Sequence, residues 1–327
     1  MGRYVLKRIG QALIVLLLAY TLAFFLLSAL PSDGVAARYA DPALGLSQAE
    51  IDQIREQMGV DKPLLEQYFS TLAGLFTGDL GYSVASGTPV ADLITDAAPH
   101  TFALAATSIG LAIVVALATA YVATLPGSGP LRRAVRSLPS FMVSLPGFWI
   151  AILLLQFFSF RLGWVNVVDP SPLEGLILPT LTLAVPMAAP LMQVLIRSID
   201  EVRAQPFVQV VRARGASEAR IFWRDVLRNS LLPAITMAGL LFGELVGGAV
   251  VTETVFGRAG LGSLTVNAVS SRDMPVLLGV VLIAATAYVV INLIVDLLYP
   301  VLDVRLRDQT TAETVNTPAT TAKEAVR

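Results

Sequence analysis

Long stretches of this chain contain no charged residue, and they restrict its fold more than any other feature. Five of them are long enough to cross the roughly 30 Å of bilayer hydrocarbon as a helix, which takes about 20 residues. They are Ile9–Leu30, Thr101–Leu125, Leu138–Phe160, Gly175–Ile196 and Met274–Val295. A sixth, Asn229–Thr252, is interrupted by Glu244 alone. Because backbone polar groups in lipid must be hydrogen-bonded within the chain, these stretches predict an all-α membrane protein with six transmembrane helices.

The composition agrees with a membrane protein and excludes several kinds of function. Hydrophobic residues make up 55% of the 327 residues and charged residues only 14%. The net charge of −1 argues against binding nucleic acid, because proteins that bind a duplex need a surplus of Lys and Arg. The chain has no cysteine and a single histidine, His100. Disulfides, thiol nucleophiles and the usual Cys and His metal sites are therefore not expected.

The distribution of Lys and Arg predicts the orientation in the membrane. Alternate loops and both termini together carry 17 of the 23 basic residues, whereas the opposite set of loops carries 6. Loops rich in Lys and Arg remain on the cytoplasmic side. The sequence therefore predicts that both termini are cytoplasmic. The apolar part of Ile9–Leu30 is longer than the roughly 7–15 residues of a signal peptide, so we interpret it as a retained helix.

The long segment after the first apolar stretch has helix signals of its own. Ser47-Gln48-Ala49-Glu50 has the pattern of a capping box and opens an amphipathic stretch that reaches Met58. A second helix is expected after Lys62-Pro63 and as far as Phe76, followed by a turn at Gly78-Asp79-Leu80-Gly81. We expect this segment to form a small helical cap on the outer side of the membrane.

Small residues define one face of the apolar stretch Asn229–Thr252. Gly239, Gly243 and Gly247 recur at every fourth position, so a second helix can approach this face closely. Glu244 lies beside them, and a carboxylate within the membrane is costly unless it meets water or a partner. Two interpretations remain open, a water-filled pathway or a pairing of Glu244 with a neighbouring helix.

Seven arginines gather in the polar segment Arg197–Arg228, which we place on the cytoplasmic side. A short apolar helix is expected before Gly215, and a second amphipathic segment, Ser217–Arg228, follows it. Such an elbow can insert one helix into a groove of a soluble protein, while the second helix continues into the next span. The alternative is an amphipathic hairpin that lies on anionic lipid headgroups.

Motifs for catalysis are absent from the sequence. There is no G-x-x-x-x-G-K-[ST] loop to hold a nucleotide, no H-E-x-x-H pair and no G-x-S-x-G elbow. We therefore expect a non-enzymatic chain that binds no cofactor and has no catalytic or metal-binding residues. Any ATP would be hydrolysed by another subunit.

Several motifs in order along the chain resemble the membrane subunits of binding-protein-dependent ABC importers. The resemblance is to the dipeptide/oligopeptide/nickel permease family and to the subunit type with the longer outer loop. The clearest matches are Met58-Gly59-Val60-Asp61-Lys62-Pro63, Gly78-Asp79-Leu80-Gly81-Tyr82-Ser83, Arg212-Ala213-Arg214-Gly215, Leu227-Arg228-Asn229-Ser230-Leu231-Leu232-Pro233, Gly247-Gly248-Ala249-Val250-Val251-Thr252-Glu253-Thr254-Val255-Phe256 and Asn292-Leu293-Ile294-Val295-Asp296-Leu297-Leu298-Tyr299. Departures occur at Pro31-Ser32-Asp33-Gly34, Gln209-Val210-Val211 and Asp303-Val304-Arg305.

The resemblance implies a type I ABC importer permease fold and a function in solute uptake. Its implied partners are a second, similar permease subunit, two ATP-binding subunits and an extracytoplasmic substrate-binding protein. The implied cargo is a di- or oligopeptide, with nickel, haem or glutathione as alternatives. The residues that would couple to the ATP-binding subunit are Phe207, Val210, Val211, Arg212, Ala213, Arg214, Gly215, Ala216 and Ser217. An ion-coupled carrier that uses Glu244 as its ion site is the alternative from another class.

Four parts of the chain follow from these expectations. Residues 1–30 form the first transmembrane helix, and residues 31–99 form the outer helical cap. Residues 100–303 form the core, which includes a cytoplasmic coupling loop at 197–230. Residues 304–327, rich in Thr and Ala, form a disordered tail.

Overall fold

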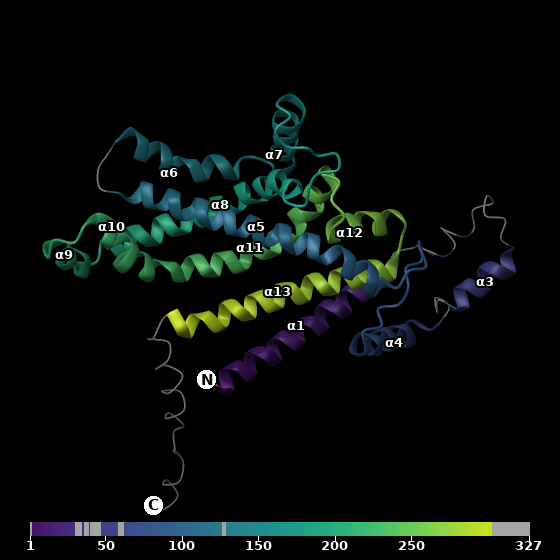
Figure 1. The fold of residues 1–327 in the computed structure, drawn as a ribbon. Helices are drawn as coiled ribbons and strands as arrows, with labels where there is room; N and C mark the ends of the chain where they lie inside the picture. The colour runs from purple at the N-terminus through teal and green to yellow at the C-terminus, as the bar shows by residue number, and fades with distance from the viewer. Residues whose placement is uncertain are drawn as a thin grey trace, which may run out of the picture.

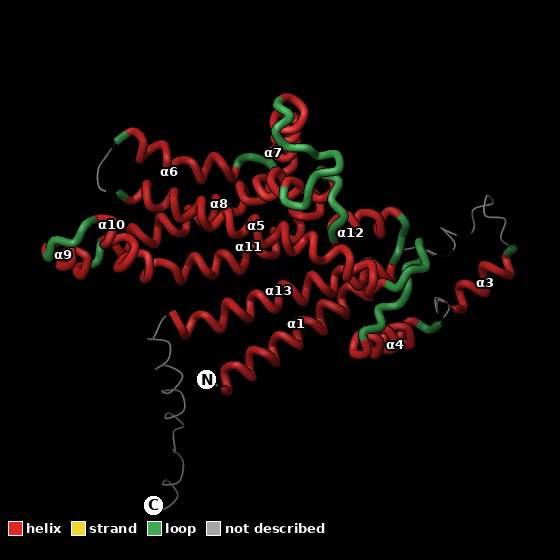
Figure 2. Tube along the Cα trace, viewed as in Figure 1, coloured by secondary structure: helices red, strands yellow, loops and turns green. Residues whose placement is uncertain are grey.

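The computed structural model describes residues 2–29, 35, 39, 47–57, 62–125 and 129–302. Among these residues the regular structure is helical, with one isolated bridge between Tyr82 and Pro89 (Figure 2). The predicted disordered tail at 304–327 lies outside the described residues, and so does most of 30–46.

Five long helices are apolar enough to span a membrane. They are α1 (Gly2–Ser28), α5 (Val90–Thr124), α8 (Glu174–Arg203), α11 (Leu227–Val255) and α13 (Met274–Leu302). They run side by side as an elongated bundle, in which α8 packs on α5 and α11 while α1 packs on α13 (Figure 1). The prediction of an all-helical chain with several apolar spans is confirmed.

The third apolar stretch does not form the single helix that its length predicts. It is divided between α6 (Pro130–Val143) and a second helix made of α7 (Gly147–Leu154) and η2 (Leu155–Arg161), and the two meet at a bend of 103°. The break falls just before Gly147, where Pro146 has an extended backbone and no N–H to donate to a helix. The described residues therefore contain five continuous spans, or six if the bent pair counts as one.

The second span begins earlier than the uncharged stretch suggests. Helix α5 starts at Val90, directly after Pro89, so Pro99 and His100 lie inside it and not at its outer end. The uncharged stretch that begins at Thr101 is thus the later part of a longer helix, because charge content marks where a helix can enter lipid and not where the helix begins. The last ten residues of the expected cap, 90–99, therefore belong to α5.

The outer segment folds locally as its helix signals predict. Helix α3 (Gln48–Gln57) begins with the capping box. The Ser47 backbone N–H and the Ser47 hydroxyl both donate to Glu50 Oε2, over 2.7 Å and 2.8 Å. These bonds to Ser47 lower the pKa of the Glu50 carboxyl, because they stabilise its charged form. Helix α4 (Leu64–Thr77) follows Pro63 and ends at Gly78, whose φ of 79° is the left-handed conformation that glycine adopts without strain.

Small side chains allow the central helices to approach closely. Ala112, Ala116 and Ala120 of α5 are fully buried, and they belong to the same apolar cluster as Ala189 and Met192 of α8. The largest core of the molecule therefore lies along α8, between α5 and α11.

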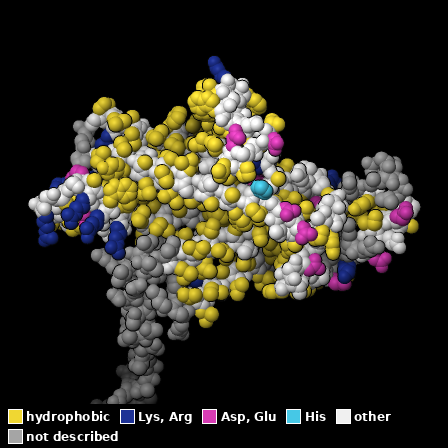
Figure 3. All heavy atoms as spheres, viewed as in Figure 1, with side chains coloured by type: hydrophobic (Ala, Val, Ile, Leu, Met, Phe, Trp, Pro, Cys, Tyr) yellow, Lys and Arg dark blue, Asp and Glu magenta, His cyan; other side chains and the backbone are white. Residues whose placement is uncertain are grey.

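The two ends of the bundle differ in charge. A broad hydrophobic band covers the middle of the visible face, Lys and Arg gather at the end that carries α9, and Asp and Glu gather around α3 and α4 (Figure 3). Helix α9 (Pro206–Ala213) and the short α10 (Glu218–Arg220) form the tip of the basic end (Figure 1). The remaining helix, α12 (Leu261–Ser270), lies near the opposite end.

Candidate functional site

The segment between α8 and α11 folds into a helical elbow. Helix α9 is followed by a turn at Gly215, then by α10 and the π-helical η3 (Ile221–Val226), which continues directly into α11. Ser217 is the N-cap of α10, and its side chain accepts a hydrogen bond from the Arg220 backbone N–H over 3.3 Å. The predicted residues 207–217 thus lie together at one tip of the bundle.

A glycine turn fixes the angle of the elbow. Gly215 has φ +83°, and its backbone N–H donates to Arg212 O over 2.9 Å. The Ala216 N–H donates to Val211 O over 3.4 Å, and both side chains pack against the main core. This is a Schellman ending, which requires a left-handed residue at the position of Gly215. A Cβ at Gly215 would meet nothing within 4 Å, so the requirement for glycine comes from the backbone angle.

Helix α9 has one buried and one exposed face. Val208 is fully buried, and Val211 packs on the core cluster that contains Ile221 and Phe222. On the outer face, Phe207 is 37% exposed and Val210 is 51% exposed. The outer face also carries Ala213, and the exposed Arg212 and Arg214 lie on the same short segment. The elbow therefore presents apolar side chains framed by arginines to its surroundings.

A single carboxylate holds the elbow together. Glu218 Oε1 accepts from Arg212 Nε over 2.9 Å, and Glu218 Oε2 accepts from Arg203 Nη1 over 3.1 Å. Arg203 ends α8, Arg212 lies on α9 and Glu218 opens α10, so three helices meet at this group. The Arg203 side chain is only 13% exposed, which strengthens its attraction to Glu218 relative to an ion pair in water.

A second ion pair connects α8, the helix that leads into the elbow, to α6. Arg136 Nη2 donates to both oxygens of Asp200 over 2.8 Å, and Arg136 Nε donates to Ala123 O over 2.9 Å. Arg132 Nε donates to the same Ala123 carbonyl. Two arginines thus satisfy a backbone carbonyl in the last turn of α5 and connect α5, α6 and α8 at the basic end.

The glycine face of α11 meets α13 along part of its length. A Cβ at Gly239 would lie 3.3 Å from Val295 Cγ2, and one at Gly243 would lie 3.3 Å from Tyr288 Cε2. A Cβ at Gly247 would meet nothing within 4 Å. Close packing therefore applies to the first two glycines, while Gly247 faces open space.

Glu244 is exposed on the surface of this single chain. It lies on a stripe of α11 that also exposes Leu240, Gly247 and Val251, at the spacing of one helical face. No hydrogen bond or ion pair joins Glu244 to another residue in the described part of the chain. Within the described part of this chain no helix pairs with Glu244, so both interpretations, a water-filled pathway and a pairing with a neighbouring helix, stay predictions.

At the end of α11 that is far from the elbow, the buried carboxylate of Glu253 joins α11 to α5 and α12. Glu253 is fully buried, and it accepts hydrogen bonds from Thr101 Oγ1 over 2.6 Å and from the Gly262 N–H over 2.7 Å. Thr101 in turn accepts from the Leu261 N–H over 2.8 Å. These bonds satisfy free N–H groups in the first turn of α12, which has no side-chain cap of its own.

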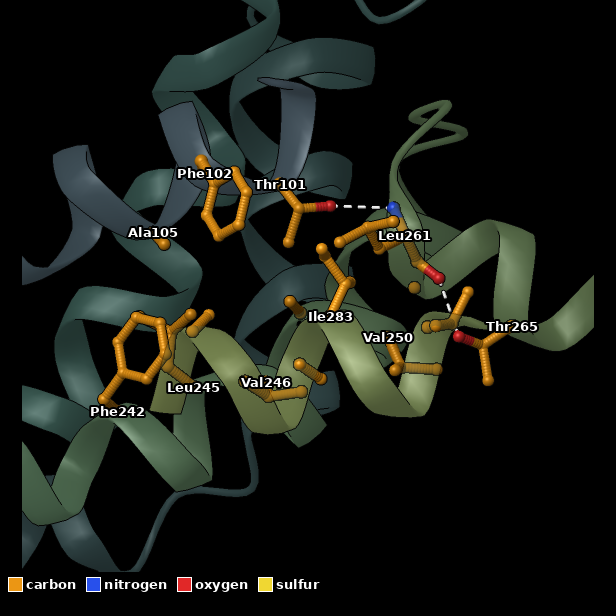
Figure 4. A pocket seen from close by; sticks show the side chains of 15 residues that line it. Thr101, Phe102, Ala105, Phe242, Leu245, Val246, Val250, Leu261, Thr265 and Ile283 are labelled. Carbon is orange, nitrogen blue, oxygen red and sulfur yellow. Dashed lines mark hydrogen bonds between the residues drawn. The ribbon is translucent and has the colours of Figure 1, made fainter. Parts of the chain in front are cut away.

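The cavity beside this carboxylate is small and apolar. It has a volume of about 40 Å³, and Phe102, Leu245 and Ile283 are among the residues that line it (Figure 4). Thr101 lies at its rim with its hydroxyl directed toward Leu261 (Figure 4). A space of this size has room for about one to three water molecules.

The sequence did not single out several residues that organise these regions. Glu218 and Asp200 lie among arginines within 197–228, and Glu253 was visible only as part of a motif. An acidic residue inside a basic loop was the available signal for Glu218. Among the described residues, no group of three or more His, Cys, Asp or Glu is arranged to hold a metal ion.

Known families match almost the whole chain. The sequence model described as "Binding-protein-dependent transport system inner membrane component" matches residues 112–308. A second, described as the N-terminal part of a binding-protein-dependent transport system membrane component, matches residues 1–105.

Curated relatives match over nearly their full length. The glutathione transport system permease protein GsiC of Pectobacterium atrosepticum is 35% identical over 310 residues, which cover 94% of this chain and 99% of the relative. GsiC of Escherichia coli K12 is 34% identical over 307 residues, with the same coverage. A provisionally named peptide permease of Brucella suis is 34% identical over 318 residues.

Solved structures show the same arrangement of helices. An inward-facing structure of the MetNI methionine ABC transporter matches with a TM-score of 0.54 at 19% sequence identity. The match covers 64% of this chain and 96% of the other. At this identity the match establishes the fold.

Proposed function

We propose a transport cycle for this chain from one premise: the chain belongs to the family of binding-protein-dependent transport system inner membrane components. It is a non-catalytic, multi-pass permease subunit of an ATP-binding-cassette importer in the inner membrane, and ATP is hydrolysed on partner subunits. ATP-binding and solute-binding partners follow from membership of the family.

The proposed cargo is a short peptide. Relatives that match over nearly their whole length are named as glutathione and peptide permeases, and glutathione is itself a tripeptide. Glutathione is therefore a candidate within the same class, while nickel and haem are alternatives of other chemistry. We propose that this chain binds no cofactor.

The proposed assembly contains a second, similar permease subunit, two ATP-binding subunits and an extracytoplasmic binding protein. The chain would cross the membrane six times, with the bent pair α6 and α7–η2 as one crossing and both termini in the cytoplasm. The separation of charge between the two ends of the bundle supports this orientation (Figure 3), because the basic end is the one that remains inside the cell.

The elbow is the proposed site of contact with an ATP-binding subunit. The observation that carries this proposal is its construction: a rigid turn that exposes apolar and basic side chains at the basic tip of the bundle. The proposed contact residues are those predicted from the sequence: Phe207, Val210, Val211, Arg212, Ala213, Arg214, Gly215, Ala216 and Ser217. Val211 and Ala216 contribute by packing the elbow on the core.

The exposed stripe of α11 is the proposed wall of the solute pathway. Glu244 and Gly247 face away from this chain's own core, and this exposure supports a position at which a second permease subunit would close the passage. Gly239 and Gly243 would keep α11 close to α13. Movement of the elbow on ATP binding would then rock the helices between inward-open and outward-open states.

Substitution of Gly215 tests the coupling role. We expect Gly215→Val to abolish solute-stimulated ATP hydrolysis and uptake in the assembled, reconstituted transporter, because a branched residue cannot adopt φ +83° without strain. Gly215→Asn is the matched control, since Asn tolerates this conformation, and it should retain most activity. Normal stimulation in Gly215→Val would refute the assignment.

The ion-coupled carrier makes a different prediction. It requires that the purified chain alone take up solute in vesicles when an ion gradient is imposed, and that Glu244→Gln abolish this uptake. The importer requires ATP and partner subunits. Uptake that depends on the gradient and on Glu244, without ATP, would favour the carrier.

A further inference from the structure

Helix α4 of the outer segment has three distinct faces. At about 100° per residue, Tyr68, Leu72 and Leu75 share one face. Leu65, Phe69 and Phe76 fall within about 40° of one another on the neighbouring face, and Glu66, Ser70 and Thr77 lie beyond it. The three residues of the middle face are 63%, 62% and 87% exposed, in that order. The helix therefore carries an exposed apolar stripe between a packed face and a polar face.

The packed face attaches α4 to the sides of two membrane helices. Tyr68 lies against the rings of Tyr20, Phe24 and Phe25 of α1, with ring centroids 5.1–5.7 Å apart. The Tyr20 hydroxyl donates to Tyr68 O over 2.7 Å, and the hydroxyls of Tyr68 and Thr21 are 2.8 Å apart. Leu278 and Leu282 of α13 belong to the same apolar cluster.

These contacts lie on the apolar, candidate membrane-spanning parts of both helices. Tyr20 is eight residues before the end of α1 at Ser28, and Leu282 is eight residues after the start of α13 at Met274. At 1.5 Å per residue, both positions are about 12 Å from the outer ends of their helices. The hydrocarbon of one leaflet is about 15 Å thick. With both helices across the bilayer in the proposed orientation, on which this inference rests, α4 packs beside the part of each span that passes through the outer leaflet.

The two helices of the outer segment differ in their content of charged residues. The ten residues of α3 include Glu50, Asp52, Arg55 and Glu56, whereas the fourteen residues of α4 include only Glu66. Glu66 lies 3.4 Å from Lys62 at the beginning of α4, and both side chains are about half exposed. The composition of α3 suits water, and that of α4 suits an interface between water and an apolar phase.

We propose that α4 is an interfacial helix whose stripe of Leu65, Phe69 and Phe76 inserts into the outer leaflet of the membrane. The lipid-facing surface of α1 exposes Leu18, Leu22 and Leu26 next to the attachment site, so the stripe continues an apolar surface that lipid already covers. The polar face with Glu66, Ser70 and Thr77 then meets the headgroups and water. In this position α4 anchors the outer segment at the side of the bundle, against α1 and α13.

The absence of cysteine from the chain permits a direct test. Single variants Phe69→Cys and Phe76→Cys on the stripe, and Ser70→Cys and Thr77→Cys on the polar face, each receive a nitroxide label. The complete transporter, with any partner-subunit cysteines replaced, is reconstituted into phosphatidylethanolamine–phosphatidylglycerol vesicles. Collision of the label with oxygen, which concentrates in lipid, is compared with collision with a water-soluble nickel chelate.

We expect oxygen to dominate at residues 69 and 76, and the nickel chelate to dominate at residues 70 and 77. Dominance of the chelate at 69 and 76 would overturn the proposal, and so would protection from both reagents, which would indicate a protein partner. Addition of solute-loaded binding protein should leave the spectra at 69 and 76 unchanged. Immobilisation of these labels would assign the stripe to the binding protein instead. The test requires only that α1 spans the membrane, so its result is independent of the coupling role of Gly215.

Discussion

Single carboxylates determine how helices meet at both ends of the bundle. Glu218 joins Arg203 and Arg212 at the elbow, and Glu253 joins Thr101 to the beginning of α12 at the other end. Each accepts hydrogen bonds from two separate elements, so its loss leaves donors without partners. Those donors are shielded from water around Glu253, whereas at Glu218 only the Arg203 side chain, 13% exposed, is largely buried. Such a loss costs more than that of an exposed ion pair.

Glu218→Gln should uncouple ATP hydrolysis from uptake. The neutral amide attracts the two arginines less strongly, and we expect the elbow to lose about 1 kcal/mol of local stability. Uptake per ATP hydrolysed should fall roughly fivefold, the factor that corresponds to this free energy. Glu201→Gln is the matched control, because Glu201 and Arg197 form an exposed pair within one helix. An unchanged ratio of uptake to hydrolysis in Glu218→Gln would show that the ion pairs of Glu218 with Arg203 and Arg212 do not transmit movement of the elbow.

At the scale of elements, the packing of α12 on α11 depends on a glycine. A Cβ at Gly262 would lie 2.5 Å from Val250 Cα, a contact with backbone that a rotamer change cannot relieve. Gly262→Ala should therefore lower the free energy of unfolding by about 1–3 kcal/mol, measured as a lower thermal midpoint of the purified complex. In Gly247→Ala the new Cβ meets open space, and the midpoint should remain the same or rise slightly. Equal midpoints for the two variants would contradict this account of the packing.

The capping box of α3 should make that helix sensitive to acid. Because the hydrogen bonds from Ser47 lower the pKa of Glu50 in the folded state, their contribution is complete above the unfolded pKa of about 4.3 and disappears as the pH falls through the lower folded value. Hydrogen-exchange protection of residues 48–57, corrected for intrinsic rates, should fall from about pH 5 to about pH 3. Glu50→Gln should remove most of this dependence, whereas Glu56→Gln should keep it. A protection that does not change with pH in the unmodified chain would be the contrary result.

The elements that sequence predicts well are those with local causes. The capping box of Ser47 and Glu50, the turn at Gly78 and the glycine ending at Gly215 each depend on residues within one or two helical turns. A count of apolar residues alone treats 138–160 as one span, but Pro146 within it is a residue that kinks or ends a helix, and the break between α6 and α7 falls there. The partners of Glu218 and Glu253 were missed, because Arg203 and Thr101 approach them only after the bundle has formed.

At the scale of the molecule, the orientation in the membrane is open to a direct measurement. Lys62 precedes α4, one of the two helices around which Asp and Glu gather, and Arg133 lies in the first turn of α6, whose Arg132 and Arg136 bind the last turn of α5. A membrane-impermeant maleimide should label Lys62→Cys in intact cells, and should label Arg133→Cys only after permeabilisation. The unmodified chain, which has no cysteine, provides the blank. Labelling of Arg133→Cys in intact cells would reverse the orientation.

One helical stretch of 38 residues runs from Glu218 through η3 to Val255, and it therefore contains both carboxylates. At 1.5 Å per residue, this rod is about 57 Å long. The wide turns of η3 are the place in the described rod where the α-helical repeat changes, so the rod can stretch or rotate there most easily. A push on the basic tip that η3 does not absorb would therefore reach α12, at the opposite end of the bundle. In the proposed cycle, one continuous helix would thus connect the inward-facing and outward-facing openings.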